Sequence, residues 1–339
     1  MNIREMFTPA EIAAQWTEVY SNRIPYLGEG LFPERKKAGL DLGWIRGNKG
    51  LPVSLMPSAF DVQSTFRDRI GLEKLETEMP FFKEGFKLKE KDRQDLLRIG
   101  ENDSAYADAI ISRIYDDANN LLEGAYVVPE RMAMQLLFPT DGHPGVAIKA
   151  NGVDYTYAYD PDNSWYAANY FALTSPDLWT NTSGADPFAS IETVQNAIRN
   201  ATGTELKTMV MNSYTFNLLK NLDALKNRFL TTTGTTVGYI TKGDVLRVIG
   251  DTLGLNIAVY DKMYKNESGT ASKFVPDGYV ALIPDGDLGN TWRGTTPEEA
   301  DLLSGNTADV SVLGNGIAIK RIVEPDPVNV NTIVSEIVL

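Results

Sequence analysis

The chain has no cysteine and a single histidine, His143, in 339 residues. The lack of cysteine excludes disulfides, thiolate nucleophiles and cysteine-bound zinc. Histidine is the usual general base and the commonest metal ligand, so one copy leaves little from which to build a conventional catalytic centre. We therefore expect no enzyme activity, no metal site and no cofactor.

Long hydrophobic runs are also missing. No apolar stretch approaches the roughly 18 residues that indicate a membrane span, and the first residues, Met1 to Phe7, lack the apolar core of a secretory signal. The sequence thus predicts a protein that is made in a cytoplasm and does not enter a membrane. Hydrophobic residues make up 43% and charged residues 23%, which is typical of a globular chain that can bury a sizeable core.

The net charge is negative and unevenly distributed along the chain. The net charge is −13, yet residues 30–100 contain 14 Lys and Arg against 11 Asp and Glu, so the rest of the chain carries −16. A basic segment on an acidic body favours contact between unlike parts of neighbouring copies. The same acidity argues against tight binding to duplex DNA, which requires Lys and Arg to neutralise phosphates.

The hydrophobic pattern predicts an α+β protein. Thr8 and Pro9 are typical of a helix start, a long helix follows Asn102 or Asp103 and should bend or restart at Pro129, and Asn151-Gly152 is a turn pair between strands at 146–150 and 153–159. Helices and strands then alternate over residues 186–305, with one helix expected at 214–225. Strands return from Val310 and are expected to pair with the 146–159 hairpin, which makes 186–305 an insertion.

The ribbon from Phe60 to Met79 is the most informative stretch. Apolar and charged residues alternate in both halves, with Gly71 between them, which predicts two strands. A lone hairpin is marginally stable in water, and the neighbouring segments are rich in Gly, Lys and Glu, so the apolar stripe needs another surface to cover it. We predict that another copy of the chain supplies that surface. The apolar residues predicted to make this contact are Phe60, Val62, Phe66, Leu75 and Met79.

The remaining candidate sites have simpler structural interpretations. His143 follows the long helix in a turn and has neither a cysteine nor a second histidine beside it, which favours a surface or packing role. Asp160 and Asp162 resemble the start of a calcium loop, but Trp165 and Phe171 stand where such a loop needs Gly and Glu, so a turn is the better interpretation. Glu298 and Glu299 follow Pro297, as in the first turn of a helix.

The order of these parts resembles a tailed-phage major capsid protein of the Hong Kong 97-type fold, and more closely the lambda-type family of major capsid protein E. The resemblance covers nearly the whole chain and depends on the order of its motifs. They are Leu31-Phe32-Pro33, Lys36-Lys37-x-Gly39-Leu-Asp41, Pro57-Ser-Ala-Phe60-Asp61, Met79-Pro-Phe-Phe82, the helix around 107–122, Ile283-Pro-Asp285-Gly286 and Val334-Ser-Glu-Ile-Val-Leu339.

This resemblance implies a division of the chain and a function. It implies an N-terminal arm (1–34), an extended E-loop (35–98), a peripheral domain with a long spine helix (99–185 and 306–339) and an axial domain (186–305). The expected protein self-assembles into hexamers and pentamers of an icosahedral phage head around double-stranded DNA, contacted non-specifically. Expected partners are the portal, a scaffold or maturation protease and a decoration protein, with assembly in the host bacterial cytoplasm and residence in the virion.

Two other functions stay open at this stage. A shell of the same fold can enclose enzymes, as in an encapsulin-like compartment, and a neighbouring enzyme gene without portal or terminase genes would favour it. A carboxylate-based, metal-dependent hydrolase is the other alternative. Loss of a turnover on changing Asp160 and Asp162 to amides, with assembly intact, would support the hydrolase.

Overall fold

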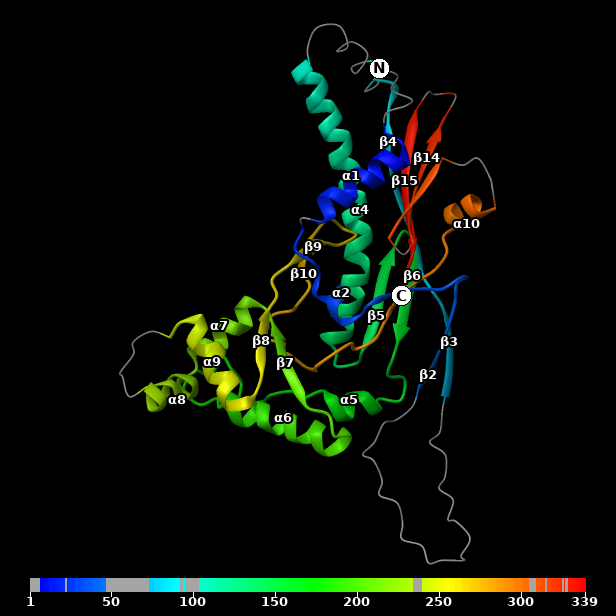
Figure 1. Cartoon of the computed structure of the whole chain (residues 1–339). Helices are drawn as coiled ribbons and strands as arrows, with labels where there is room; N and C mark the ends of the chain where they lie inside the picture. Colours follow the sequence, from blue (N-terminus) through cyan, green and yellow to red (C-terminus); the bar gives the residue numbers. More distant parts are fainter. Residues whose placement is uncertain are drawn as a thin grey trace, which may run out of the picture. The chain divides into compact units, whose positions relative to one another are not determined.

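The computed structural model describes residues 7–21, 23–46, 73–91, 94, 104–233, 240–304, 309–314, 316–324, 326 and 329–339. The chain divides into two compact units, each built from separated segments (Figure 1). Unit 1 comprises residues 1–42, 76–133 and 287–339, and unit 2 comprises residues 43–75 and 134–286.

Unit 1 combines helices with a four-stranded antiparallel sheet of strand order β13-β14-β15-β4, and a separate parallel pair, β1 and β12. Its helices are α1 (Pro9–Ser21), α2 (Leu27–Leu31), most of α4 (Ser104–Leu137) and α10 (Pro297–Leu303). Its strands are β1 (Glu34–Lys36), β4 (Phe81–Leu88), β12 (Thr291–Arg293), β13 (Val310–Leu313), β14 (Ile317–Val323) and β15 (Val330–Ile337).

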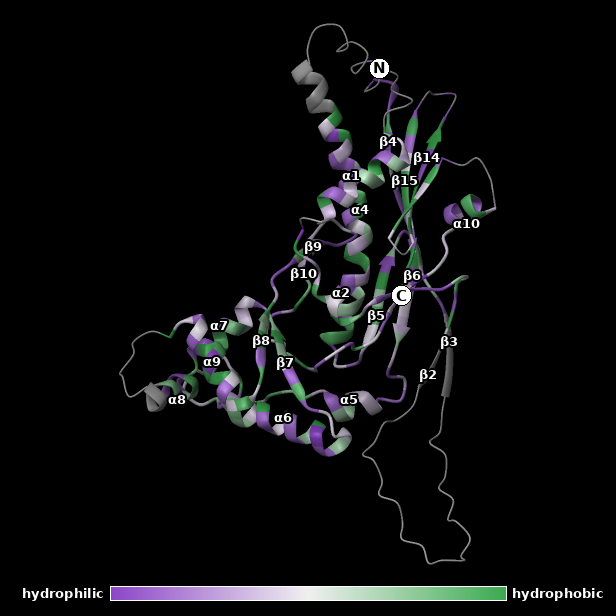
Figure 2. Ribbon diagram, viewed as in Figure 1, coloured by the Kyte–Doolittle hydropathy of each residue, from purple (hydrophilic) through white to green (hydrophobic). Residues whose placement is uncertain are grey.

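The core of unit 1 lies between the sheet, α1 and α4, which runs beside the sheet in Figure 1. One face of α4 contributes apolar side chains at helical spacing, and β14, largely hydrophobic in Figure 2, contributes residues from the sheet. The main contributors are Ile12, Trp16, Ile114, Ala118, Leu122, Ile317, Ile319 and Val334. The start of α1 is fixed as predicted, because Thr8 Oγ1 accepts from Glu11 N while Thr8 N donates to Glu11 Oε2.

The prediction that the C-terminal strands pair with the 146–159 hairpin is wrong. β15 pairs along its whole length with β4, from Val330 opposite Leu88 to Ile337 opposite Phe81, and among the described strands the 146–159 hairpin pairs only with itself. One edge of that hairpin is already occupied. The side-chain amide of Gln135 both donates to Ala147 O and accepts from Ala147 N, so on the β5 edge it takes backbone groups that a further strand would need.

The predicted ribbon is described only in its second half. Residues 73–78 form β3 (Glu73–Glu78), as expected for a strand, and β3 pairs with β2 (Asp41–Arg46). The first half, with Phe60, Val62 and Phe66, lies outside the described residues. Next to β3, Met79 N donates to Leu40 O, which continues the pairing into unit 1.

Unit 2 contains a three-stranded sheet of order β11-β7-β8, two hairpins and helices that cover the sheet. Its helices are α5 (Ser164–Asn169), α6 (Pro187–Thr202), α7 (Ser213–Asn221), α8 (Asp223–Thr233) and α9 (Lys242–Leu253). Its strands are β5 (Gly145–Ala150), β6 (Val153–Ala158), β7 (Leu206–Met211), β8 (Asn256–Val259), β9 (Met263–Lys265), β10 (Ala271–Lys273) and β11 (Ala281–Pro284). Met209, Leu219, Leu225 and Ile249 are completely buried in its core.

Two helix predictions need correction. The helix expected over 214–225 is two helices, α7 and α8, because the chain turns at the fully buried Leu222 and Asp223 N donates to Thr182 O. The long helix does not restart at Pro129, because α4 is continuous from Ser104 to Leu137 with the proline inside it. Residues next to the proline are held by packing: Glu130 is 2% exposed and its carboxylate accepts from Gly28 N at 2.7 Å.

Candidate functional site

A buried ion cluster joins three segments of unit 1 that lie far apart in the sequence. Arg293 on β12 is 1% exposed, and its Nη1 donates to Glu336 Oε2 on β15 at 2.6 Å. Its Nε and Nη2 donate to Glu34 Oε1 on β1 at 2.8 and 2.7 Å. We call Arg293, Glu34 and Glu336 the Arg293 clasp. Because hydrogen bonds to charged groups are about twice as strong as neutral ones, the clasp fastens β1 to the C-terminal strand.

The clasp carries more negative charge than one guanidinium can neutralise. Burial raises the pKa of Glu336 to about 7, although Arg293 opposes this change. Burial alone would lower the pKa of Arg293, but the carboxylates of Glu336 and Glu34 more than offset it and raise the pKa. Among the residues that the structure describes, none forms a hydrogen bond with the buried Oε1 of Glu336. The Glu336 carboxyl is therefore the least well satisfied member of the clasp.

A second set of ion pairs connects α10 with the strands. Glu298 is 2% exposed, pairs with Lys83 on β4 at 2.6 Å and accepts from Ser335 Oγ on β15 at 2.8 Å. Burial pushes the pKa of Glu298 upward, but Lys83 and Ser335 outweigh it and hold the pKa below its usual value. The expected helix start at Pro297 is confirmed, with Thr296 as N-cap. α10 is thus fixed to β4 and β15.

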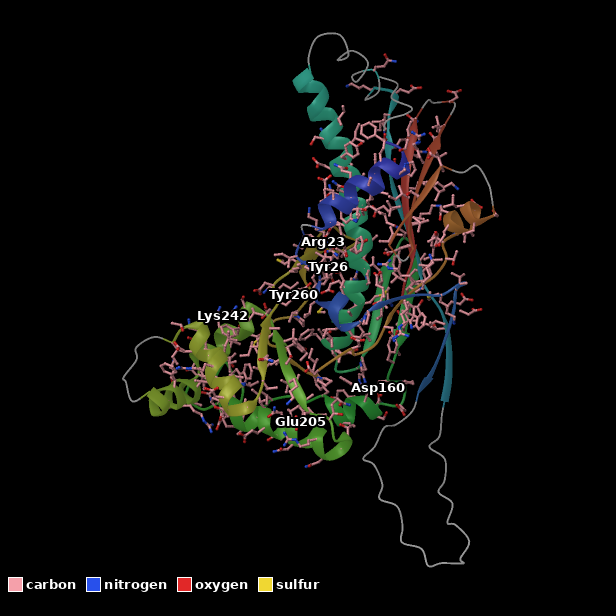
Figure 3. All side chains as sticks on the ribbon, viewed as in Figure 1. Arg23, Tyr26, Asp160, Glu205, Lys242 and Tyr260 are labelled. Atoms are coloured by element: carbon pink, nitrogen blue, oxygen red, sulfur yellow. The ribbon has the colours of Figure 1, made fainter. Side chains whose placement is uncertain are left out.

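A third cluster holds the segment that follows α1. The guanidinium of Arg23 lies over the rings of Tyr20, Tyr26 and Tyr126 at 4.1, 4.6 and 4.9 Å from their centroids, and it forms an ion pair with Glu29. Figure 3 shows Arg23 and Tyr26 in this region. Burial raises the pKa of Tyr126 to about 12. Cation–π contacts of this kind are worth about 2 kcal/mol when desolvated, so this cluster anchors the N-terminal segment to α4.

These clusters have a common effect on the molecule. They fix the N-terminal segment, β4 and the C-terminal strands to one another within unit 1. Buried ion pairs add little net stability, so their effect here is on how these segments are arranged.

The structure describes only part of the set of five residues predicted to contact another copy of the chain. Phe60, Val62 and Phe66 lie outside the described residues, and Leu75 is on β3 with its side chain outside the description. Met79 is 3% exposed, so its apolar surface is already covered within the chain. The intersubunit role of these residues stays a prediction.

The acidic loop and the histidine form local structure in unit 2. Both carboxylate oxygens of Asp160, which is labelled in Figure 3, accept backbone N–H groups, from Trp165 and Tyr166 at 2.9 Å each. Asp162 accepts from Ser164 in the same turn. His143 stacks on Tyr166 with ring centroids 4.6 Å apart, and its Nδ1 lies 3.6 Å from Asp160 Oδ2. The turn interpretation of Asp160 and Asp162 and the packing interpretation of His143 are confirmed.

Within the described ranges, no group of three or more His, Asp or Glu side chains could hold a metal ion. In the same part of the chain, no helix is both long and apolar enough to cross a bilayer.

The residues of the ion clusters were not identified from the sequence. Arg293 lies 43 residues from Glu336 and 259 residues from Glu34, and the sequence around it has no special pattern. For Glu298 and Glu299 the sequence predicted a helix start, but not the ion pairs that they form. Tertiary structure alone brings these charges together.

Comparisons with solved structures identify the fold. A chain described as the capsid protein of an Escherichia coli CFT073 prophage is similar with a TM-score of 0.60 and 12% sequence identity, over 98% of this chain and 94% of that chain. A phage-related protein from Bordetella bronchiseptica RB50 is similar with a TM-score of 0.50 and 12% identity, over 98% and 92% of the two chains. No curated protein sequence matches this chain. The fold is the α+β capsid fold of the Hong Kong 97 type.

The family follows from the sequence as a whole. The model of the family described as "Phage major capsid protein E" matches residues 8–337, so the chain belongs to that family. It is a major capsid protein, which forms the icosahedral shell of a phage head and associates with further copies of itself in capsomers. Its family and fold are those of a structural protein of the virion.

Proposed function

We propose that copies of this chain form hexamers and pentamers of a phage head that encloses double-stranded DNA. The observation that carries the proposal is the family match over residues 8–337, together with a fold that extends over the same length. Shells of this kind depend on many modest contacts, and at about 25 cal/mol per Å² of buried apolar surface a few side chains per contact suffice when repeated over many copies.

The test is expression of the full chain together with the genes that flank it, followed by electron microscopy of the particles. Closed icosahedral particles with six-fold and five-fold capsomers are the expected result. A chain that stays a stable single subunit in the presence of these partners would contradict the proposal. Nuclease protection of DNA in particles from infected cells tests whether the particles enclose double-stranded DNA.

The division of the chain in this proposal has four parts. Residues 1–34 form the arm, 35–98 the E-loop, 99–185 with 306–339 the peripheral domain, and 186–305 the axial domain. Support comes from the discontinuous make-up of unit 1, in which N-terminal, central and C-terminal segments share one core. The compact units and this functional division cut the chain at different residues. Residues 134–185 belong to unit 2, whereas the proposed division places them in the peripheral domain.

The E-loop is proposed to lie on a neighbouring subunit and to bury Phe60, Val62 and Phe66 there, with Leu75 and Met79 near its base. The alternation of apolar and charged residues in the sequence supports this role. Replacing Phe60, Val62 and Phe66 together by Ser should abolish particles while the melting temperature of the free subunit changes by less than about 2 °C. Normal particle yield from this variant would contradict the contact.

The further partners are a portal, a scaffold or maturation protease and a decoration protein, with non-specific contact to the DNA. Assembly takes place in the host bacterial cytoplasm. These partners follow from membership of the family and from the need of a closed shell for an opening through which DNA enters. Mass spectrometry of purified particles tests them, since each partner should be present at a fixed ratio to the capsid protein.

A further inference from the structure

Two carboxyl groups of the Arg293 clasp share one buried guanidinium, which carries a single positive charge. Glu34 on β1 accepts two hydrogen bonds from Arg293, and Glu336 on β15 accepts the third. The two acids differ in their access to water, since the side chain of Glu34 is 26% exposed and that of Glu336 is 2% exposed. Two carboxylates that share a site repel each other when both are ionised. The clasp is therefore balanced in charge when one of the two carboxyl groups is neutral.

The other charged groups beside the clasp are already balanced by one another. In the described part of unit 1, the two lysines that flank the clasp each form an ion pair with an acid of α10. These pairs are Lys36 with Glu299 and Lys83 with Glu298. Burial raises the pKa of Tyr20 on α1 and of Tyr126 on α4, whose ring centroid lies 5.9 Å from Arg293 Cζ. Both phenols are thus neutral around pH 7, and the charge on Glu336 depends chiefly on Arg293 and Glu34.

Glu336 is the carboxyl group better suited to hold a proton. Among the described residues, none forms a hydrogen bond with its buried Oε1. Removal from water penalises an ionised carboxylate more than a neutral carboxyl group. Burial accordingly raises the pKa of Glu336 to about 7, and the negative charge of Glu34 acts in the same direction. The proton is therefore bound or lost within the ordinary range of pH.

β1 is the element that can give way when both carboxyl groups are ionised. It has three residues, two of them exposed, and its described strand partner is β12. At the ends of β1, Thr291 N donates to Pro33 O at 3.1 Å and Lys37 N donates to Arg293 O at 2.8 Å. β15, in contrast, pairs along its whole length with β4 and also pairs with β14. Repulsion between the carboxylates therefore displaces β1 and leaves β15 in place.

We propose that the Glu336 carboxyl group holds a proton that allows Glu34 to stay on Arg293, and that loss of this proton detaches β1 from β12. The clasp then acts as a pH-sensitive switch. It is closed with one proton bound and open when both carboxyl groups are ionised. Since β1 lies between α2 and β2, the switch controls how firmly this connection is held to the C-terminal strands. All three residues belong to one chain, so the inference does not depend on the proposed assembly.

The test is hydrogen exchange of the free full-length chain at single-residue resolution, at about pH 6 and about pH 8. These conditions lie on either side of the pKa of Glu336. Results are compared as protection factors, which remove the intrinsic rise of exchange rates with pH. The protection factors of the Lys37 and Thr291 amides should fall about tenfold from the lower to the higher pH, because both amides bond across β1 and β12.

Two neighbouring amides serve as an internal control. Trp292 N donates to Leu339 O at 2.8 Å, and Gly294 N donates to Ile337 O at 2.9 Å. Both bonds connect β12 or its end to the C-terminal segment and not to β1. Their protection factors should change by less than about twofold between the two conditions, since release of β1 leaves these bonds intact.

Three variants test the role of the proton. Glu336→Gln removes the group that holds it, and Glu34→Gln removes the repelled charge while keeping an oxygen that can accept from the guanidinium. In each, the fall at the two β1–β12 amides should shrink to less than about twofold. Glu205→Gln is the matched control, because the Glu205 side chain is 60% exposed in unit 2, and it should retain the tenfold fall.

The inference is overturned if all four amides lose protection together, which would show global unfolding instead of a local release. It is equally overturned if the Lys37 and Thr291 amides keep the same protection at both pH values in the unaltered chain. A fall that persists unchanged in Glu34→Gln would exclude repulsion between the two carboxylates as its cause. If Glu336→Gln does not fold, Glu34→Gln and the comparison of the four amides still decide the question.

Discussion

At the scale of residues, the buried guanidinium of Arg293 holds β1 and β15 together in unit 1. It is 1% exposed and neutralises parts of two carboxylates on separate strands. A buried ion pair adds little net stability, but loss of one partner leaves the other charge buried and uncompensated. The clasp therefore makes unit 1 sensitive to single substitutions at these positions.

Arg293→Met should lower the free energy of unfolding by about 3–5 kcal/mol, because it leaves Glu336 buried without a counter-charge. Denaturant unfolding of the free subunit measures this change. Arg199→Met is the control, since Arg199 is exposed and its removal should cost no more than about 0.5 kcal/mol. Adding Glu336→Gln to Arg293→Met should restore part of the loss, and no recovery would speak against the charge explanation.

Glu336 also makes stability depend on pH. Its pKa is about 7 in the folded chain, above the usual value of 4.5. A carboxyl with a raised folded-state pKa stabilises the fold fully below its unfolded-state pKa, and this contribution is lost as the pH rises through the folded-state pKa. The free energy of unfolding should thus fall between pH 5 and pH 8, by at most about 3 kcal/mol. Glu336→Gln should flatten this slope in unfolding curves, and an unchanged slope would exclude Glu336 as its source.

At the scale of elements, two glycines have opposite roles in spite of similar surroundings. A Cβ added at Gly124 in α4 or at Gly152 in the β5–β6 turn meets no atom within 4 Å. Gly152 has φ = +78°, which side chains disfavour, whereas Gly124 lies inside a helix. Space is equal at both sites, so the backbone conformation decides the effect of a substitution.

Gly124→Ala should raise the free energy of unfolding by about 0.5–1 kcal/mol, since Ala favours a helix interior. Gly152→Ala should lower it by about 1–2 kcal/mol through left-handed backbone strain. Thermal or denaturant unfolding of the two variants, measured side by side, checks both signs. Destabilisation by Gly124→Ala would show that the helix has less room there than the structure gives.

At the scale of the whole molecule, charge separates the chain into unlike parts. The net charge is −13, whereas residues 30–100 carry a net charge of +3 (14 basic against 11 acidic side chains). Contacts between unlike parts of neighbouring copies fit this distribution, while a mainly acidic chain repels phosphates. An acidic shell protein would let packaged DNA move without adhering to the wall.

Empty particles should therefore retain little double-stranded DNA even at low salt, where phosphate contacts are strongest. Co-sedimentation of particles with linear DNA at about 20 mM and about 200 mM salt measures this. A histone-like basic protein in place of the particles is the positive control. Tight DNA binding at low salt that disappears at high salt would contradict the prediction that the acidic shell repels DNA.

Much of the local structure was predictable from the sequence. Thr8 with Pro9 marks the start of α1, Asn151-Gly152 marks the β5–β6 turn, and Pro297 followed by Glu298 and Glu299 marks the start of α10. Each of these signals depends on residues close together in the chain, where backbone geometry and capping chemistry act directly. The order of motifs along the chain was also enough to predict the capsid family.

The long-range pairings were decided only by the tertiary structure. No local rule makes β15 choose β4, because the alternating pattern of β15 is equally compatible with the 146–159 hairpin, whose β5 edge is occupied by Gln135 in the folded chain. Likewise, Arg293 has no pattern that predicts partners 43 and 259 residues away. The sequence by itself determined many of the local elements, the charge distribution and the family, since these depend on composition and near neighbours. Which strands pair and which charges are buried depends on competition among surfaces that meet only when the chain is folded.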